Sequence, residues 1–169
     1  MENRGAEKTW MRLQIESRSS NEEFARVTAA VFLSRMNPTV EEMEDVKTAV
    51  SEAVTNCVIH GYRERPGIIY IEAEIEGREF TVRVRDEGAG IADVRKAMEP
   101  MYTSDPTGER SGMGFSFMEA FMDEVKVESK PGRGTLVTMK KRIGGTAREA
   151  AQDRKTGAGN EGIGGIAYG

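Results

Sequence analysis

The segment from Thr39 to Gly61 constrains the fold more than any other part of the chain, because it predicts one long helix with two chemically different faces. Thr39 and Glu42 have the spacing of a capping box, and Gly61 is a typical helix terminator. At about 100° per residue, one stripe of this helix holds the apolar residues Met43, Val46, Val50, Val54 and Cys57. Because an amphipathic helix buries its apolar stripe, we expect this stripe to pack on a sheet.

A polar row occupies another side of the same helix, where Glu52, Asn56 and His60 follow one another at four-residue steps. Such rows are common on ordinary solvated helix faces, and a histidine at a helix end often interacts with the helix dipole. An acid and an amide, together with two separate glycine-rich turns, are also what a protein needs to hold a magnesium nucleotide and act on its terminal phosphate. Taken alone, the row leaves both interpretations open.

Alternating apolar and polar residues predict five strands, at 11–15, 69–75, 80–84, 125–128 and 135–140. The middle two form a hairpin with a turn at Gly77, and the last two flank the turn at 131–134. The segment 100–111 contains two prolines and several hydroxyl residues, which predicts a long mobile loop.

Two further helices complete the predicted order. The first is indicated by the capping-box spacing of Ser20 and Glu23, and Asn37-Pro38 breaks it. Its apolar positions at helical spacing are Phe24, Val27 and Val31. The second begins near Gly114 and has an apolar stripe of Phe115, Met118 and Met122. The order strand, two helices, hairpin, helix, hairpin predicts an α+β fold, a two-layer α/β sandwich whose mixed, mostly antiparallel sheet is covered on one face by helices.

Composition limits the partners and the compartment that we expect. The chain has 169 residues, 38% apolar and 31% charged, which is typical of one soluble globular domain. A net charge of −4 argues against nucleic-acid binding, because phosphate backbones attract basic surfaces. The single cysteine, Cys57, allows no intrachain disulfide and no cysteine-based metal cluster. No apolar stretch approaches a membrane span and the polar start is unlike a secretory signal, so we expect a cytoplasmic protein.

The composition changes near the C-terminal end of the chain. From Gly144 onward, glycine, alanine and scattered charges follow without hydrophobic periodicity. We therefore divide the chain into a domain at 1–143 and a Gly-rich tail at 144–169, and we expect the tail to be disordered.

Three glycine-rich turns follow the long helix in the sequence. The turn 86–90, Asp-Glu-Gly-Ala-Gly, ends a predicted strand, where the Asp86 carboxylate could accept a hydrogen bond from an exocyclic amine such as that of adenine. The turn 112–114, Gly-Met-Gly, opens a predicted helix, where free N–H groups suit a phosphate. The third turn, 132–135, lies in a predicted hairpin. Each turn alone is common in proteins, but their order at the ends of predicted elements favours a nucleotide site.

These residues resemble a known set of motifs. Glu52-x-x-x-Asn56, Asp86-x-Gly88-x-Gly90, Gly112-x-Gly114 and Gly132-x-Gly134-Thr135 look like the N, G1, G2 and G3 boxes of the GHKL ATPase superfamily, which implies the Bergerat ATP-binding fold. Within that superfamily, longer strings resemble the anti-sigma factors of sporulation, which are serine kinases. These strings are 51–56, 60–62, 85–88 and 109–115. The resemblance runs from about Met11 to Ile143.

The resemblance implies a role for each matched residue, with ATP and Mg²⁺ as the cofactors. Glu52 would be the general base that takes the proton from a protein serine hydroxyl, and Asn56 would coordinate Mg²⁺ through its side-chain oxygen. Asp86 would bind the adenine amino group, and the other residues on the adenine side would be Gly88, Gly90 and Thr135. The residues that bind or neutralise the phosphates would be Arg110, Gly112, Met113 and Gly114.

The resemblance also implies protein partners. A sigma factor of the sigma F type would be bound and inhibited, and a STAS-type anti-anti-sigma protein would be phosphorylated and thereby inactivated. Arg26, in the stretch 21–26, would lie on the surface that contacts both partners, although an ordinary surface arginine would have the same surroundings in the sequence. The resemblance further implies a homodimer, and we expect neither a nucleic acid nor a membrane among the partners.

Two other functions of this superfamily were weighed against these expectations. A histidine kinase needs a dimerisation helix pair with a phospho-accepting histidine, whereas the one histidine here, His60, lies in the N-box. A non-catalytic module that holds ATP only to shape a docking surface remains the alternative. The chain departs from the resembled family in its lid, where Thr103-Ser104-Asp105-Pro106 replaces the usual Thr-Thr-Lys-Pro, and in the tail, which has no counterpart.

Overall fold

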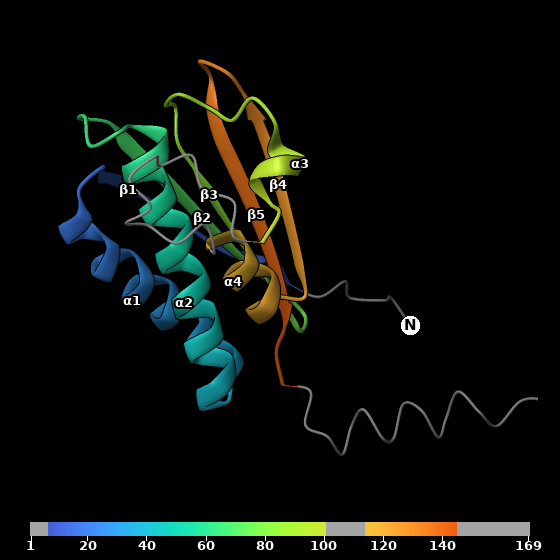
Figure 1. The fold of residues 1–169 in the computed structure, drawn as a ribbon. Coiled ribbons are helices and arrows are strands. Elements are labelled where there is room, and N and C mark those ends of the chain that lie inside the picture. The colour runs from blue at the N-terminus through green and yellow to red at the C-terminus, as the bar shows by residue number, and fades with distance from the viewer. Residues whose placement is uncertain (1–6, 101–113, 145–169) are drawn as a thin grey trace, which may run out of the picture.

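The computed structural model describes residues 7–100 and 114–144. Their strands form one sheet in the order β1-β2-β3-β5-β4, and helices lie over one of its faces (Figure 1). The strands are β1 (Thr9–Glu16), β2 (Ile68–Glu76), β3 (Glu79–Arg85), β4 (Glu124–Lys130) and β5 (Gly134–Arg142). The predicted α+β two-layer fold is therefore confirmed. A mixed, mostly antiparallel sheet was expected. In the described sheet, each pair of adjacent strands is antiparallel.

Four α-helices are described together with three short helical turns. The helices are α1 (Glu22–Leu33), α2 (Val40–Asn56), α3 (Val94–Ala97) and α4 (Gly114–Phe121). The turns are the 3₁₀ segments Ser19–Asn21 and Ser34–Met36 and the π-helical segment Cys57–Gly61. Within the described parts of the chain, none of these helices has the length and apolar character needed to cross a bilayer.

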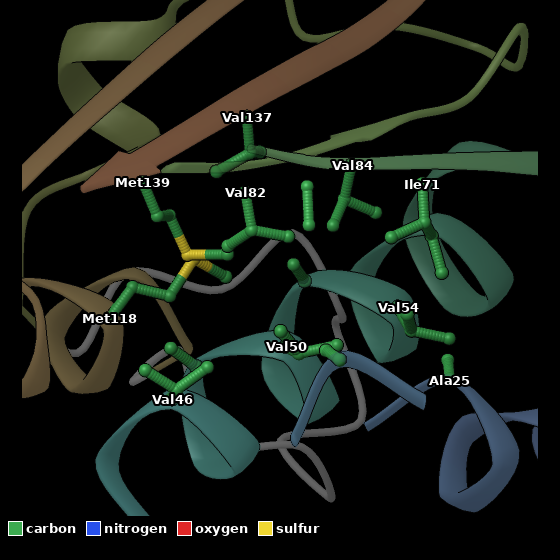
Figure 2. Close-up of a cluster of buried hydrophobic side chains, with 14 of the residues drawn as sticks. Ala25, Val46, Val50, Val54, Ile71, Val82, Val84, Met118, Val137 and Met139 are labelled. Atoms are coloured by element: carbon green, nitrogen blue, oxygen red, sulfur yellow. The ribbon is translucent and has the colours of Figure 1, made fainter. Parts of the chain in front are cut away.

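Helix α2 forms as the sequence predicts. The Thr39 hydroxyl accepts a hydrogen bond from the Glu42 N–H at 3.1 Å, and the Glu42 carboxylate accepts one from the Thr39 N–H at 2.8 Å, so both halves of the capping box are present. The predicted apolar stripe faces the sheet: Met43 is partly buried, and the buried members are Val46, Val50, Val54 and Cys57. Figure 2 shows its labelled valines beneath side chains of the sheet, among them Val82, Val84 and Met139. This helix anchors the core.

Helix α1 differs from its prediction at its start and in the face that it buries. Ser20 lies in the preceding 3₁₀ turn and the residue that precedes the helix, Asn21, makes no side-chain cap, so the capping box expected for Ser20 and Glu23 is not the start of this helix. The buried residues are Ala25, Ala29, Ala30 and Leu33. The apolar residues of the predicted stripe are instead exposed, by 57% (Phe24), 46% (Val27) and 65% (Val31). The small alanine side chains on the buried side let α1 lie close to α2, and the predicted stripe is left to solvent.

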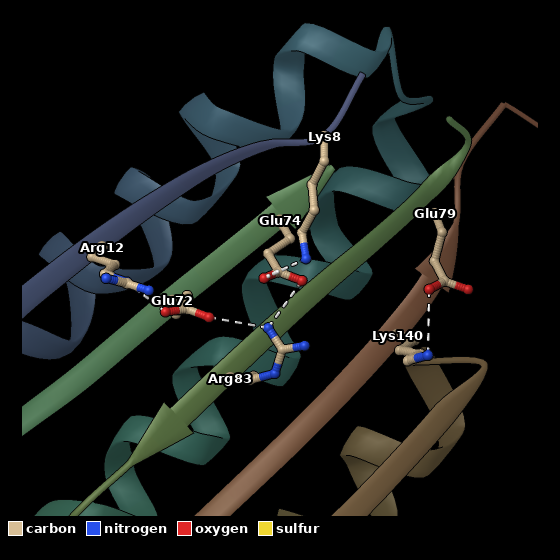
Figure 3. A network of polar contacts seen from close by, with 7 residues as sticks. All are labelled: Lys8, Arg12, Glu72, Glu74, Glu79, Arg83 and Lys140. Atoms are coloured by element: carbon tan, nitrogen blue, oxygen red, sulfur yellow. Dashed lines mark hydrogen bonds and ion pairs between the residues drawn. The ribbon is translucent and has the colours of Figure 1, made fainter. Parts of the chain in front are cut away.

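The opposite face of the sheet carries charged side chains, which Figure 3 shows as a network across the strands. Arg83 on β3 contacts the carboxylates of Glu72 at 3.2 Å and Glu74 at 3.1 Å, both on β2. Arg12 and Lys8 contact the same two carboxylates from the other side, at 2.6 and 3.0 Å. Because β-strand side chains alternate between faces, the apolar members of these strands point to the helices and this polar face is left to solvent.

Candidate functional site

A cleft of about 510 Å³ lies at the C-terminal end of α2. It is bounded by this helix end, by the turn after β3, by the start of β5, by α3 and by the start of α4. Five of the predicted site residues line it: Asn56, Asp86, Gly90, Gly114 and Thr135. Four segments that are far apart in the sequence therefore contribute predicted residues to one cavity.

Glu52 and Asn56 meet the start of α4. A Cβ atom placed on Gly114 would lie 3.2 Å from Oε2 of Glu52 and 3.3 Å from Oδ1 of Asn56. The predicted base, the predicted metal ligand and the N-terminus of a helix thus converge on one point. Burial raises the pKa of Glu52, and the negative charge of Glu22 on α1 raises it further. A carboxylate with a raised pKa is a stronger proton acceptor than an ordinary glutamate.

Asp86 lies at another wall of the cleft, directly after β3. The residue is only 4% exposed, and its carboxylate accepts a hydrogen bond from the Gly88 N–H at 2.9 Å. Burial raises the pKa of Asp86, while hydrogen bonds from Gly88, the Cys57 thiol and Thr135 act in the opposite direction. A Cβ atom on Gly61 would lie 2.8 Å from Cγ of Asp86, so the end of α2 fits closely against this carboxylate.

The turn that follows Asp86 depends on Gly90. Its φ of +71° lies in the left-handed region, which glycine adopts without steric cost. A Cβ atom at this position would come within 2.1 Å of the Lys130 carbonyl oxygen, so the hairpin between β4 and β5 packs directly on the turn. Thr135, on the same hairpin, has its hydroxyl 2.9 Å from the Ser129 hydroxyl. This packing holds Gly90 and Thr135 at the cleft wall opposite the end of α2.

The remaining predicted residues are distributed as follows. Gly88 belongs to the Asp86 turn, and His60 lines the cleft as an exposed side chain. Arg26 lies on α1, where its guanidinium pairs with Glu22 at 3.3 Å and with Glu23 at 3.7 Å, outside the set of residues that line the cleft. The lid residue Asp105, the predicted phosphate-side residues Arg110, Gly112 and Met113, and the tail after Gly144 fall outside the described residues.

Several residues that line the cleft were missed by the sequence reasoning. They include Cys57, Arg63, Ile91, Asp93 and Lys96. Lys96 belongs to α3, a four-residue helix, and Asp93 caps it: the Asp93 side chain accepts a hydrogen bond from the Lys96 N–H at 3.0 Å. An Asp is a helix-start signal, but one turn is too short for a periodic pattern to be recognised. Cys57 belongs to the apolar stripe and also hydrogen-bonds Asp86, which no periodicity could indicate.

Known proteins share this arrangement of strands, helices and turns. Residues 16–141 match the family described as "Histidine kinase-like ATPase domain". The chain belongs to this family, and the predicted resemblance to the GHKL superfamily is confirmed.

Relatives named "Anti-sigma F factor" are similar over most of their length. That of Clostridium acetobutylicum is 58% identical over 133 residues, which cover 79% of this chain and 93% of the relative. Those of Thermoanaerobacter sp. and Halalkalibacterium halodurans are 56% and 53% identical, each over 134 residues covering 79% of this chain, and 94% and 92% of the respective relatives.

A solved structure shares the fold at lower sequence identity. It contains the RsbU and RsbW domains of a Mycobacterium tuberculosis protein, and it superposes with a TM-score of 0.58 at 19% identity. The superposition covers 80% of this chain and 32% of that protein, so this chain corresponds to about a third of the larger molecule. At this identity the likeness concerns the fold.

Proposed function

We propose that this chain is an anti-sigma factor that binds ATP with Mg²⁺, inhibits a sigma factor of the sigma F type, and phosphorylates a serine of a STAS-type anti-anti-sigma protein. The observation that carries the proposal is the meeting of Glu52 and Asn56 with Gly114 beside a cleft whose other wall holds the buried Asp86. The similarity to the proteins named "Anti-sigma F factor" supports the same conclusion.

The residues of the cleft fit a magnesium nucleotide. The volume of the cleft, about 510 Å³, is within the usual range for small-molecule sites. The close approach of α4 to Asn56 leaves an amide oxygen beside the N–H groups of a helix start, where an oxygen-seeking cation and a phosphate would both find partners. Asp86 would bind the adenine amino group, with Gly88, Gly90 and Thr135 around it. Arg110, Gly112 and Met113 are proposed to join Gly114 on the phosphate side.

Glu52 would act on the substrate serine. When bound, Mg·ATP would supply the phosphoryl group, with ADP as the leaving group, and the cation would offset the negative charge of the phosphates. The Glu52 carboxylate accepts the proton of the serine hydroxyl, and Oε2 is the oxygen nearest to the start of α4. Because burial and Glu22 raise the pKa of Glu52, this carboxylate holds the proton more firmly than an exposed glutamate would. The proton then passes to solvent, since the side chain is only partly buried.

Protein partners would dock on α1. Arg26 is proposed to contact both the sigma factor and the anti-anti-sigma protein, so that the two compete for one surface. The exposed apolar residues on the same helix, Phe24, Val27 and Val31, would add to this contact. The protein is further proposed to act as a homodimer in the cytoplasm, and the division into a domain at 1–143 and a Gly-rich tail at 144–169 stays a prediction.

One experiment separates this function from a purely binding one. The full chain is incubated with labelled ATP, Mg²⁺ and a candidate anti-anti-sigma protein, and the label is located by phosphopeptide analysis. Label on a serine of that protein supports the kinase. ATP-dependent sigma-factor binding without labelling would replace the kinase by a non-catalytic docking module. If the chain neither labels the anti-anti-sigma protein nor binds a sigma factor, both functions are wrong.

A further inference from the structure

The loop between α2 and β2 contains a side chain to which the proposed function assigns no role. The π-helical end of α2 is closed by a hydrogen bond from the Tyr62 N–H to the Cys57 carbonyl at 2.8 Å. Arg63 and Glu64 follow with φ angles of 53° and 61°, in the left-handed region that residues other than glycine rarely adopt. Such a backbone persists only where surrounding contacts hold it. Here the Glu64 N–H donates to the Val58 carbonyl at 2.9 Å, and the Arg65 N–H donates to the Tyr62 carbonyl at 3.0 Å.

The Tyr62 phenol joins the start of one strand to the end of another. Its hydroxyl donates to the Ile68 carbonyl at 2.5 Å, at the start of β2, and accepts from the Glu87 N–H at 2.9 Å, just beyond β3. The ring lies against Gly67, where a Cβ atom would come within 2.4 Å of it. Burial raises the pKa of Tyr62, so the phenol keeps the proton that it donates to Ile68 at neutral pH.

The turn at 86–89 has a partner for each of its four consecutive N–H groups. Three of the partners are the Thr135 carbonyl at 3.0 Å, the Asp86 carboxylate at 2.9 Å and the Gly61 carbonyl at 2.8 Å. The fourth is the Tyr62 hydroxyl, which binds the Glu87 N–H and is the one side chain from another segment among them. Because the next N–H, that of Gly88, orients the Asp86 carboxylate, a shift of the Glu87 amide would turn this carboxylate.

We propose that Tyr62 is a positioning residue for recognition of the base, because its hydroxyl holds the Glu87 amide and thereby aims the Asp86 carboxylate at the adenine amino group. The inference rests on the proposed nucleotide-binding function. Tyr62 is not among the residues that line the cleft, so it acts through Asp86 rather than by touching the nucleotide.

The test compares two nucleotides that differ in one group. ATP and purine riboside triphosphate, which lacks the 6-amino group, are titrated as Mg²⁺ complexes into the full chain, and the ratio of the two dissociation constants reports the amino-group contact. Tyr62→Phe keeps the ring on Gly67 and removes the hydroxyl. We expect ATP affinity to fall about three- to tenfold and affinity for purine riboside triphosphate to change by less than about twofold.

Two further variants make the outcome decisive. Tyr70→Phe removes the same atom from a ring that stacks with Arg85 at 4.0 Å and is not part of the cleft lining, so both constants should stay unchanged. Asp86→Ala removes every acceptor atom of the side chain and should abolish the preference for ATP. If Asp86→Ala does so and Tyr62→Phe weakens both nucleotides equally or neither, the inference about Tyr62 is wrong while the adenine contact stands. If Asp86→Ala leaves the preference intact, the proposed adenine contact is wrong, and the Tyr62 inference with it.

Discussion

At the scale of single residues, Glu52 and Asn56 lie one helical turn apart and both reach the start of α4, yet the two side chains should contribute differently. Glu52→Ala removes the proposed proton acceptor and leaves Asn56 in place. We expect phosphotransfer to the anti-anti-sigma protein to fall by roughly 10²–10⁴ while ATP binding is largely kept. Single-turnover rates with labelled ATP measure the first quantity, and equilibrium titration measures the second.

Glu52→Gln is the matched variant, since it keeps the size of the side chain and removes the basic oxygen. It should be nearly as slow as Glu52→Ala. Phosphotransfer at the original rate in either variant would rule out Glu52 as the base.

Asn56→Ala should weaken nucleotide binding, which Glu52→Ala largely keeps. The amide oxygen is the proposed protein ligand of Mg²⁺, so we expect Mg²⁺-dependent ATP binding to be lost. Titration with ATP in the presence of Mg²⁺ and of EDTA measures the difference. Thr48→Ala, on the same helix about two turns before Asn56 and outside the cleft lining, should bind Mg·ATP normally. Tight Mg·ATP binding by Asn56→Ala would contradict the ligand role.

At the scale of elements, the sequence predicts best where the signal is local. The capping box of Thr39 and Glu42 and the apolar stripe of α2 are both contained in one segment, and both are present in the structure. Helix α1 shows the limit, because its predicted apolar stripe is exposed while its alanines and Leu33 are buried. Which stripe is buried there depends on how closely two helices approach, and periodicity carries no such information. The bond between Tyr62 and Glu87 is equally non-local.

The ion pairs on the charged face of the sheet should make the free energy of unfolding depend on pH. Burial favours a raised pKa for Glu74, but its hydrogen bonds with Lys8 and Arg83 outweigh burial and lower the pKa below 4.5. A carboxyl whose pKa is lower in the folded state stabilises the protein above its unfolded pKa and loses this contribution as the pH falls through the folded pKa. Glu74→Gln should therefore reduce the free energy of unfolding by about 0.5–1 kcal/mol at neutral pH, and the difference should shrink below about pH 4.

Urea unfolding at several pH values measures this difference. Glu79→Gln is the control, because the Glu79 side chain is 53% exposed and its carboxylate pairs with Lys140 at 3.4 Å, where solvent screens the charges. Its effect should be close to zero. A Glu74→Gln deficit that stays constant into the acid range would show that packing, and not charge, accounts for it.

At the scale of the whole molecule, α2 connects the cleft with the helix proposed to bind partners. Its apolar stripe packs on the sheet, its polar row meets α4, and its flank is joined to α1 by a hydrogen bond between the Ser51 hydroxyl and the Glu22 carboxylate. The same Glu22 carboxylate pairs with Arg26, and its negative charge raises the pKa of Glu52 beyond the effect of burial. The proposed docking surface and the proposed base therefore share one charged neighbour, although they lie on different helices.

A variant of Arg26 tests whether partner binding on α1 is separate from nucleotide binding in the cleft. Arg26→Ala should weaken binding of the sigma factor and of the anti-anti-sigma protein by about tenfold or more, the usual effect of losing a central interface arginine. ATP affinity should stay unchanged, because Arg26 is not part of the cleft lining. Arg35→Ala is the matched control, since Arg35 is an exposed arginine just beyond α1 whose guanidinium lies over Phe32. Calorimetry with each partner measures the affinities. If Arg26→Ala binds both partners as tightly as Arg35→Ala does, the docking surface lies elsewhere on the molecule.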